Sequence, residues 1–241
     1  MKKILFVTLI FSNLVFSQNI DFEGFMNFSY SNNSGKIHLE IDNLDKEFLY
    51  INSLSRGIGN NDLGLDRGQL GNTRIVFFTK RGNKILMVQP NTRYVSNSDN
   101  YLENKAVEEA FARSVLFSFE IIEEKNNNYI IDLTPLLMND AHGVAQRLRF
   151  SNSGNYSLNK SMSAIELDRT KAFPENIEFD VILTFTGNPM GNLVRSVTPT
   201  PSNITVNQHH SFVKLPDNNY KKRKFDPRSG SNPFIVYDYS T

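Results

Sequence analysis

Hydrophobic and polar residues alternate along most of this chain, and that alternation is typical of β-strands with one buried face. In KIHLEI, residues 36–41, three apolar side chains share one face, so His38 points to the other. The turn-forming sequence SNNSG separates this stretch from residues 25–30, and together they predict a β-hairpin. The same pattern predicts further strands at 48–54, 73–79, 84–89, 119–123, 129–133, 163–167, 177–186 and 203–213.

Two regions replace the alternation with helical spacing. Apolar residues at 107, 110, 111 and 115 recur as on one face of a helix, which predicts a helix of about four turns over 102–117. Thr134 followed by Pro135 is typical of a helix N-cap and first turn, and predicts short helices near 135–148. The predicted fold class is therefore α+β, mainly antiparallel β-sheet built from hairpins, with one longer helix and short helices.

The first 17 residues have the features of a secretory signal peptide. Lys2 and Lys3 precede an apolar run, 4–16, that is too short to span a bilayer, and Ser17 allows cleavage before Gln18. We therefore expect an exported protein, periplasmic or extracellular, without a membrane anchor, in which residues 18–241 form a single β-rich domain. The chain has no cysteine, so its stability depends on its core without disulfides.

The charge balance argues against one class of partner. The chain has 26 basic and 25 acidic residues, and its formal net charge is +1. Because nucleic-acid binding depends on an excess of positive charge, we expect no nucleic-acid partner. The local basic run at 221–224 is typical of a solvated loop.

The adjacent histidines His209 and His210 are the first candidates for chemistry. They fall on a predicted strand, where neighbouring side chains point to opposite faces, so they cannot easily bind one metal ion. We expect one to face the core and the other to face solvent. The chain contains no HExxH, GxSxG or GxxxxGK[ST] motif. The residues alone therefore assign no catalytic, cofactor-binding or metal-binding role, and His142 is interpreted as a helix-end or packing residue.

A loop rich in glycine and acidic residues spans 56–69. Oxygens of Asn60, Asp62 and Asp66 imitate part of a calcium-binding loop, but the closing acidic ligand is missing at the expected spacing. The simpler interpretation is a surface loop whose glycines adopt positive φ. The contact candidates that the sequence offers are Asp66, Arg67, His209 and His210.

Eight stretches, in this order, carry a family resemblance: GKIHLEIDNLDKEFLYINSL (35–54), LGLDRGQLGNTRIVFF (63–78), AVEEAFARSVLFSF (106–119), DAHGVAQRLR (140–149), RTKAFPENIEFDVILTFTG (169–187), VRSVTPTP (194–201), QHHSFVKLPD (208–217) and FDPRSG (225–230). They resemble the N-terminal region of large secreted bacterial zinc-dependent metalloproteases, in which a domain of unknown function precedes a catalytic domain of the metzincin type. The resemblance covers nearly all of residues 22–241.

The resemblance implies that the zinc ligands lie on an HExxHxxGxxH motif downstream of the matched region. The chain is then a non-catalytic N-terminal region, truncated before its catalytic domain, and zinc is expected only in that domain. The implied partner is a metallopeptidase domain, in cis or as a separate chain. The alternative is a self-standing exported module that binds peptide or glycan. An enzyme in its own right would need the fold to assemble the four contact candidates with His142.

Overall fold

The computed structural model describes residues 19–217, 219, 221, 225–230, 232 and 234–240. The predicted signal peptide at 1–17 lies outside the described residues, and so does most of the basic run at 221–224. Within the described residues, no helix combines the length and the apolar character needed to cross a membrane.

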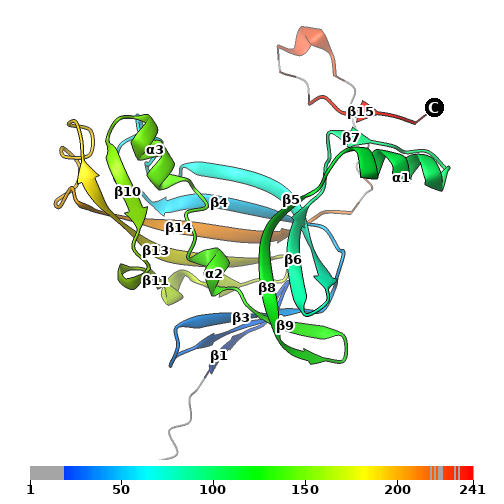
Figure 1. Ribbon diagram of the computed structural model, residues 1–241, viewed down its shortest axis with the longest axis horizontal. Helices are drawn as coiled ribbons and strands as arrows, with labels where there is room; N and C mark the ends of the chain where they lie inside the picture. The colour runs from blue at the N-terminus through cyan, green and yellow to red at the C-terminus, as the bar shows by residue number, and fades with distance from the viewer. Residues whose placement is uncertain are drawn as a thin grey trace, which may run out of the picture.

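Most of the described chain forms one antiparallel sheet that curls until its ends nearly meet (Figure 1). Thirteen strands of the described chain belong to it, and its main path runs β1-β2-β3-β9-β8-β6-β5-β4-β14-β13-β10, with β11 and β12 paired to β13. The strands are β1 Asn19–Phe22, β2 Phe28–Ser31, β3 Lys36–Ile41, β4 Phe48–Arg56, β5 Leu70–Arg81, β6 Lys84–Gln89, β8 Ser114–Lys125, β9 Asn128–Asp132, β10 Gly154–Leu158, β11 Ala164–Ile165, β12 Lys171–Ala172, β13 Asn176–Pro189 and β14 Asn203–Lys214.

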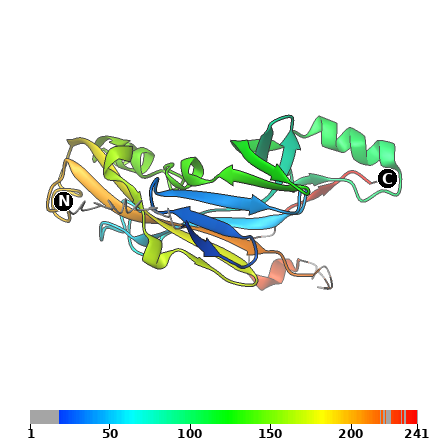
Figure 2. The same ribbon diagram turned by 90° about the horizontal axis from the view of Figure 1, so that it is seen from below.

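The remaining elements lie outside this sheet. β7 Tyr94–Val95 and β15 Tyr237–Asp238 pair with each other in parallel. The helices are α1 Tyr101–Ala110, α2 Thr134–Leu137 and α3 Val144–Phe150, with the 3₁₀ turns η1 Lys160–Met162, η2 Leu167–Arg169 and η3 Pro227–Ser229. Figure 2 shows an elongated body from which α1 and the β7–β15 pair project at one end.

The three predicted hairpins are confirmed as β2–β3, β5–β6 and β8–β9. The α+β fold dominated by antiparallel strands is confirmed with them. In β3 the alternation places Ile37 and Leu39 in the core and leaves His38 half-buried on the other face, as predicted. The two long strands predicted near 177–186 and 203–213 are β13 and β14, which pair with each other over eleven registered residue pairs.

The two ends of the sheet meet at a seam between β2 and the region of β12 and β13. The Phe28 ring lies 4.8 Å from the Phe179 ring, and the Phe25 N–H donates to the Phe173 carbonyl at 2.8 Å. A Cβ on Gly24 would approach that carbonyl oxygen to 2.7 Å, so only glycine fits this close passage. The curled sheet thus encloses one aromatic core, which includes Phe48, Phe78, Phe179 and Phe212.

The long helix predicted over 102–117 is not confirmed. α1 ends at Ala110, and residues 114–117 already belong to β8, which pairs with β6. Val115 fits the helical spacing, but it is also part of the alternating run in SVLFSF. Pairing with β6 provides hydrogen-bond partners for the backbone N–H and C=O groups of this run, and these bonds would be lost if the run formed a fourth helical turn.

The short helices predicted near 135–148 are α2 and α3, but the predicted N-cap is wrong. The N-cap residue of α2 is Leu133, and Pro135 lies in the first turn. The Thr134 hydroxyl instead accepts a hydrogen bond from the Ile37 N–H of β3 at 2.9 Å. Thr134 therefore attaches α2 to the sheet.

Candidate functional site

The two histidines of β14 lie in different surroundings, as the alternation predicts. In the register of β14 with β13, His209 faces Asp180 and His210 faces Phe179. The strand therefore turns His210 into the aromatic core and His209 to the other face of the sheet.

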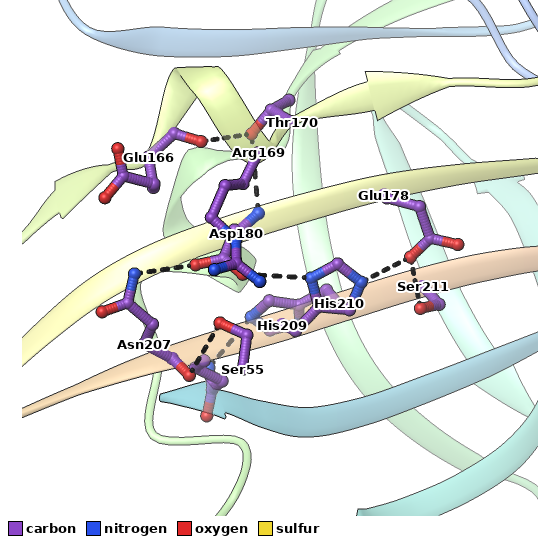
Figure 3. A network of polar contacts seen from close by, with 11 residues as sticks. Ser55, Glu166, Arg169, Thr170, Glu178, Asp180, Asn207, His209, His210 and Ser211 are labelled. Carbon is purple, nitrogen blue, oxygen red and sulfur yellow. Dashed lines mark hydrogen bonds and ion pairs between the residues drawn. The ribbon is translucent and has the colours of Figure 1, made fainter. Parts of the chain in front are cut away.

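His209 lies between two carboxylates of β13 (Figure 3). Its Nε2 is 2.7 Å from Glu178 Oε2 and its Nδ1 is 3.2 Å from Asp180 Oδ2. Its side chain is 25% exposed, and that of Asp180 is fully buried. Hydrogen bonds from Asp180 and Glu178 raise the pKa of His209 to about 9, so at neutral pH the ring is an imidazolium that donates through both nitrogens.

Both carboxylates of this network stay ionised in spite of their burial. Burial alone raises the pKa of Asp180, but hydrogen bonds from His209, Ser55 and Asn207 outweigh it and lower that pKa. Burial likewise raises the pKa of Glu178, but hydrogen bonds from His209, Ser211 and Asn176 outweigh it and lower that pKa. The network is thus a fully paired ion cluster.

Two further groups complete the network around Asp180. Arg169 Nε lies 3.5 Å from Asp180 Oδ2, and Asn207 Nδ2 donates to Asp180 Oδ1 at 2.9 Å. The Ser211 hydroxyl donates to Glu178. Because both nitrogens of the protonated His209 ring donate to carboxylates, the ring has no free lone pair and cannot serve Ser211 as a general base at neutral pH. We infer that this cluster joins β13 to β14 and to η2.

His210 belongs to a second network inside the core. The Tyr50 hydroxyl donates to His210 Nδ1 at 2.9 Å, and His210 Nε2 is 3.2 Å from the Leu137 carbonyl. Burial lowers the pKa of His210 to about 4, so the ring is neutral at pH 7. Gln208 extends the network, because its amide donates to the Asn139 carbonyl and accepts from the His142 N–H, each at 2.8 Å.

The contact candidates therefore do not converge on one site. His142 and His210 share Gln208 in the buried network, whereas His209 lies on the other face of the sheet. Asp66 accepts from the Arg67 N–H at 2.7 Å, a local turn contact in the loop between β4 and β5. This loop contributes Ile58, Leu63 and Leu65 to the core.

The glycine-rich loop is better explained by packing than by calcium binding. Asn60 Oδ1 accepts from the Leu63 N–H at 3.2 Å, so this oxygen forms a turn inside the loop. A Cβ on Gly57 would come within 2.1 Å of the Leu65 carbonyl oxygen. Nowhere in 19–217 or the later described residues do three or more His, Asp or Glu side chains gather in a way that would hold a metal ion.

The residues that sequence reasoning missed are Glu178 and Asp180. Their signal was present, since two carboxylates at i and i+2 interrupt the otherwise apolar run of IEFDVILTF on one face of the strand. The sequence of one strand does not show its register with another, so it could not show that Asp180 lies opposite His209.

A second candidate for function is a projecting surface that we call the arm, defined as residues 94–111 and 234–240 (Figures 1 and 2). Its centre is an aromatic stack, in which the Tyr94 ring lies 4.1 Å from Phe111 and 5.1 Å from Tyr237. Backbone bonds hold the C-terminal part, because the Tyr237 and Tyr239 N–H groups donate to the Arg93 and Val95 carbonyls.

The arm exposes several large apolar side chains to solvent, together with the charged residues Lys105, Glu108 and Glu109 of α1. Tyr101 at the start of α1 is 71% exposed and Leu102 69%, and in the segment before β15 Phe234 is 83% exposed, with Ile235 and Val236 also exposed. α1 contains no buried residue. A helix and strand pair with so little of their own apolar surface covered is typical of an interaction surface.

Fold and site together define a β-rich α+β domain in which His142, His209 and His210 are held in structural networks, and in which a projecting arm exposes large apolar side chains. The chain belongs to the family described as domain of unknown function DUF5117, which matches residues 68–241. The match therefore includes β5 to β15, the arm and both networks except Tyr50 and Ser55 of β4. The search of curated proteins found no match, and neither did the search of solved structures.

Proposed function

We propose that this chain is a non-catalytic module that docks on a zinc-dependent peptidase domain, in cis or as a separate chain, and that the arm is its docking surface. The exposed apolar arm is the observation that carries the proposal. Leaving Phe234, Tyr101 and Leu102 in water is unfavourable, and a partner that covers them recovers roughly 25 cal/mol per Å² of apolar surface.

The state of the histidines supports a non-catalytic role. His209 is an imidazolium between Glu178 and Asp180, and His210 is fully buried. Neither is placed to take a proton from a nucleophile or to bind a metal ion that reaches solvent. The resemblance to the N-terminal regions of exported metalloproteases suggests the kind of partner, and the predicted signal peptide supports a location outside the inner membrane for both.

The test begins with the gene. A reading frame that carries HExxHxxGxxH next to the codon for Thr241 is sought in all frames, and the polypeptide it encodes is expressed and titrated with the purified chain by calorimetry. The double variant Tyr101→Ser, Leu102→Ser is expected to weaken binding about tenfold or more. The chain alone is expected to bind no stoichiometric zinc and to cleave no peptide.

The matched control is Phe150→Ser, because Phe150 is an exposed aromatic residue on α3, outside the arm. It should bind like the unaltered chain. Chelator-sensitive proteolysis by the chain alone, or equal binding by the double variant, would overturn the proposal. Absence of such a reading frame would favour the alternative below.

A self-standing binding module for peptide or glycan is the second candidate. It is favoured by a cavity of about 420 Å³ between the arm and the curled sheet, whose lining combines the aromatic residues Phe77, Tyr94 and Phe111 with polar and charged side chains. A cooperative melt of the isolated chain, together with no affinity for any peptidase polypeptide, would select this candidate.

A further inference from the structure

The end of the body opposite the arm carries a second set of exposed apolar side chains. Phe150 of α3 is 72% exposed and Met190 53%, and Leu193 and Val197 follow in the connection between β13 and β14 at 38% and 37%. Figures 1 and 2 both show α3 and this connection together at that end of the molecule. We call this surface the tip and define it as residues 149–153 and 189–198.

Hydrogen bonds hold the backbone of the tip in place. The Met190 N–H donates to the Ser153 carbonyl at 2.9 Å, which joins the connection to the segment that follows α3. Val194 is fully buried, and the Thr198 N–H and hydroxyl both donate to its carbonyl oxygen, so one residue anchors the connection in the core. The exposed apolar side chains of the tip therefore project from a fixed loop.

The sequence around the tip lacks negative charge. Residues 141–165 and 181–216 contain no Asp or Glu, in a chain with 25 acidic residues. Arg149 and Arg195 lie in the tip itself, and among the described residues neither guanidinium is paired with a carboxylate. Arg195 donates to a backbone carbonyl at 3.1 Å, and Arg149 lies 5.8 Å from the ring of Phe150. Positive charge and apolar surface thus occur side by side.

The neighbouring loop does not cancel this charge. The loop 56–69 contacts the tip, because Asn60 Nδ2 donates to the Leu193 carbonyl at 3.4 Å, but its two acidic residues are matched by two arginines. The arm has the opposite balance, with five acidic residues and one basic residue. An anionic partner is therefore attracted to the tip and repelled by the arm.

We propose that the tip docks on the surface of a lipid bilayer that carries anionic headgroups. Phe150, Met190 and Leu193 enter the boundary between headgroups and acyl chains, while Arg149 and Arg195 remain at the level of the phosphates. A projecting set of apolar side chains flanked by arginine suits a broad, soft surface, because a folded protein would need a matching hollow to cover it. The contact is peripheral, and it goes beyond the docking proposal because it uses the opposite end of the molecule.

The first experiment places a fluorescent reporter in the tip. The chain contains no tryptophan, so Phe150→Trp gives a single reporter there, and Tyr101→Trp gives one in the arm. Both are made in the mature chain, residues 18–241, because the apolar run 4–16 would bind vesicles by itself. Phosphatidylcholine vesicles with about 30% phosphatidylglycerol are expected to shift the emission of Phe150→Trp to the blue, and brominated acyl chains are expected to quench it. Tyr101→Trp should show neither change.

The apolar part of the contact is tested by co-sedimentation with the same vesicles. The double variant Phe150→Ser, Met190→Ser is expected to weaken binding about tenfold or more, because it removes the apolar surface that enters the bilayer. The control is Tyr101→Ser, Leu102→Ser, which removes an exposed apolar pair from the arm and should bind like the unaltered chain. All four side chains are exposed, so the fold is expected to survive in both double variants.

The charged part of the contact has its own variant. Arg149→Gln with Arg195→Gln is expected to weaken vesicle binding about tenfold or more. Raising the salt concentration from about 0.05 to about 0.5 M should weaken binding of the unaltered chain in the same way. The matched control is Lys125→Gln with Lys171→Gln, two exposed lysines of β8 and β12 outside the tip, and it should keep the affinity of the unaltered chain.

Any of three results would overturn the proposal. If the emission of Phe150→Trp stays unchanged with anionic vesicles, the tip does not reach the bilayer. Equal losses in the tip variants and their controls would show that the contact is not specific to the tip. If the chain binds soluble poly-glutamate as tightly as vesicles, and the apolar double variant keeps that affinity, the tip is a site for an acidic polypeptide. The docking proposal is tested separately, because the vesicle experiments need no peptidase polypeptide.

Discussion

At the scale of single residues, the two neighbouring histidines of β14 have opposite pKa shifts because the sheet separates them. His209 gains two carboxylate partners, whereas His210 loses water and keeps only neutral partners. Each shift is also a statement about stability, because the pKa of histidine in the unfolded chain is about 6.5.

The pair predicts a stability maximum near pH 6.5. The folded pKa of His209 is raised to about 9, so its contribution is complete below pH 6.5 and is lost as the pH rises to 9. The folded pKa of His210 is lowered to about 4, so its contribution is complete above pH 6.5 and is lost as the pH falls to 4. Each limb amounts to roughly 3 kcal/mol in the unfolding free energy, measured by urea denaturation across this range.

His209→Gln is expected to abolish the loss of stability between pH 6.5 and 9 (the alkaline limb) and to keep the loss between pH 6.5 and 4 (the acid limb). It also leaves Asp180 buried without its imidazolium, so the unfolding free energy at pH 6.5 should fall by about 3 kcal/mol or more. His38→Gln is the control, because His38 lies on β3 away from both networks, and it should keep both limbs. An alkaline limb that persists in His209→Gln would contradict the assignment.

The separation of the two histidines was predictable from the sequence, but their partners were not. Period-two alternation is a local property, so it correctly sends His209 and His210 to opposite faces. Which face is the core depends on the register with β13, and the partner carboxylates lie about thirty residues away in the chain. No local pattern encodes that register.

At the scale of elements too, features built from neighbouring residues were predictable and features that depend on distant pairing were not. The hairpins were predictable because each is built from neighbouring residues and a turn. The end of α1 was not, because Val115 fits both a helical and an alternating pattern, and pairing with β6 decides between them. The β7–β15 pair joins residues 94–95 to 237–238, and it also lay beyond local reasoning.

The arm is expected to open without unfolding the sheet. Tyr237→Pro removes the N–H that donates to the Arg93 carbonyl at 2.7 Å. Amide hydrogen exchange in residues 94–97 should accelerate about tenfold, while the global unfolding free energy changes by less than about 0.5 kcal/mol.

Val236→Pro is the matched control for this change. Successive N–H groups of an extended strand point to opposite sides, so the Val236 N–H points away from β7, and the exchange of residues 94–97 should stay as it is. A fall in global stability with Tyr237→Pro would mean that the arm is part of the cooperative core.

At the scale of the whole molecule, the seam decides whether the sheet closes. Phe28 of β2 is stacked on Phe22 and lies 4.8 Å from Phe179 of β13, so one side chain connects strands from opposite ends of the sheet. Phe28→Ala is expected to lower the unfolding free energy by about 3–5 kcal/mol, through lost burial and a cavity at the seam.

Phe150→Ala is the comparison for the seam. Phe150 is an exposed phenylalanine, and its removal should change the unfolding free energy by less than about 0.5 kcal/mol. Equal effects of the two substitutions in urea denaturation would show that the seam contributes little and that the sheet is held by strand pairing alone.

The histidine pair also has a consequence for how β14 finds its place during folding. A slip of one residue exchanges the two faces of β14, and in one direction it sets His210 opposite Asp180, where it can take the place of His209. Because the surroundings set the pKa of each ring, the two histidines can exchange their charge states in the slipped alignment. The register of β14 therefore depends on its apolar residues, since Ile204, Val206 and Phe212 would all leave the core after such a slip.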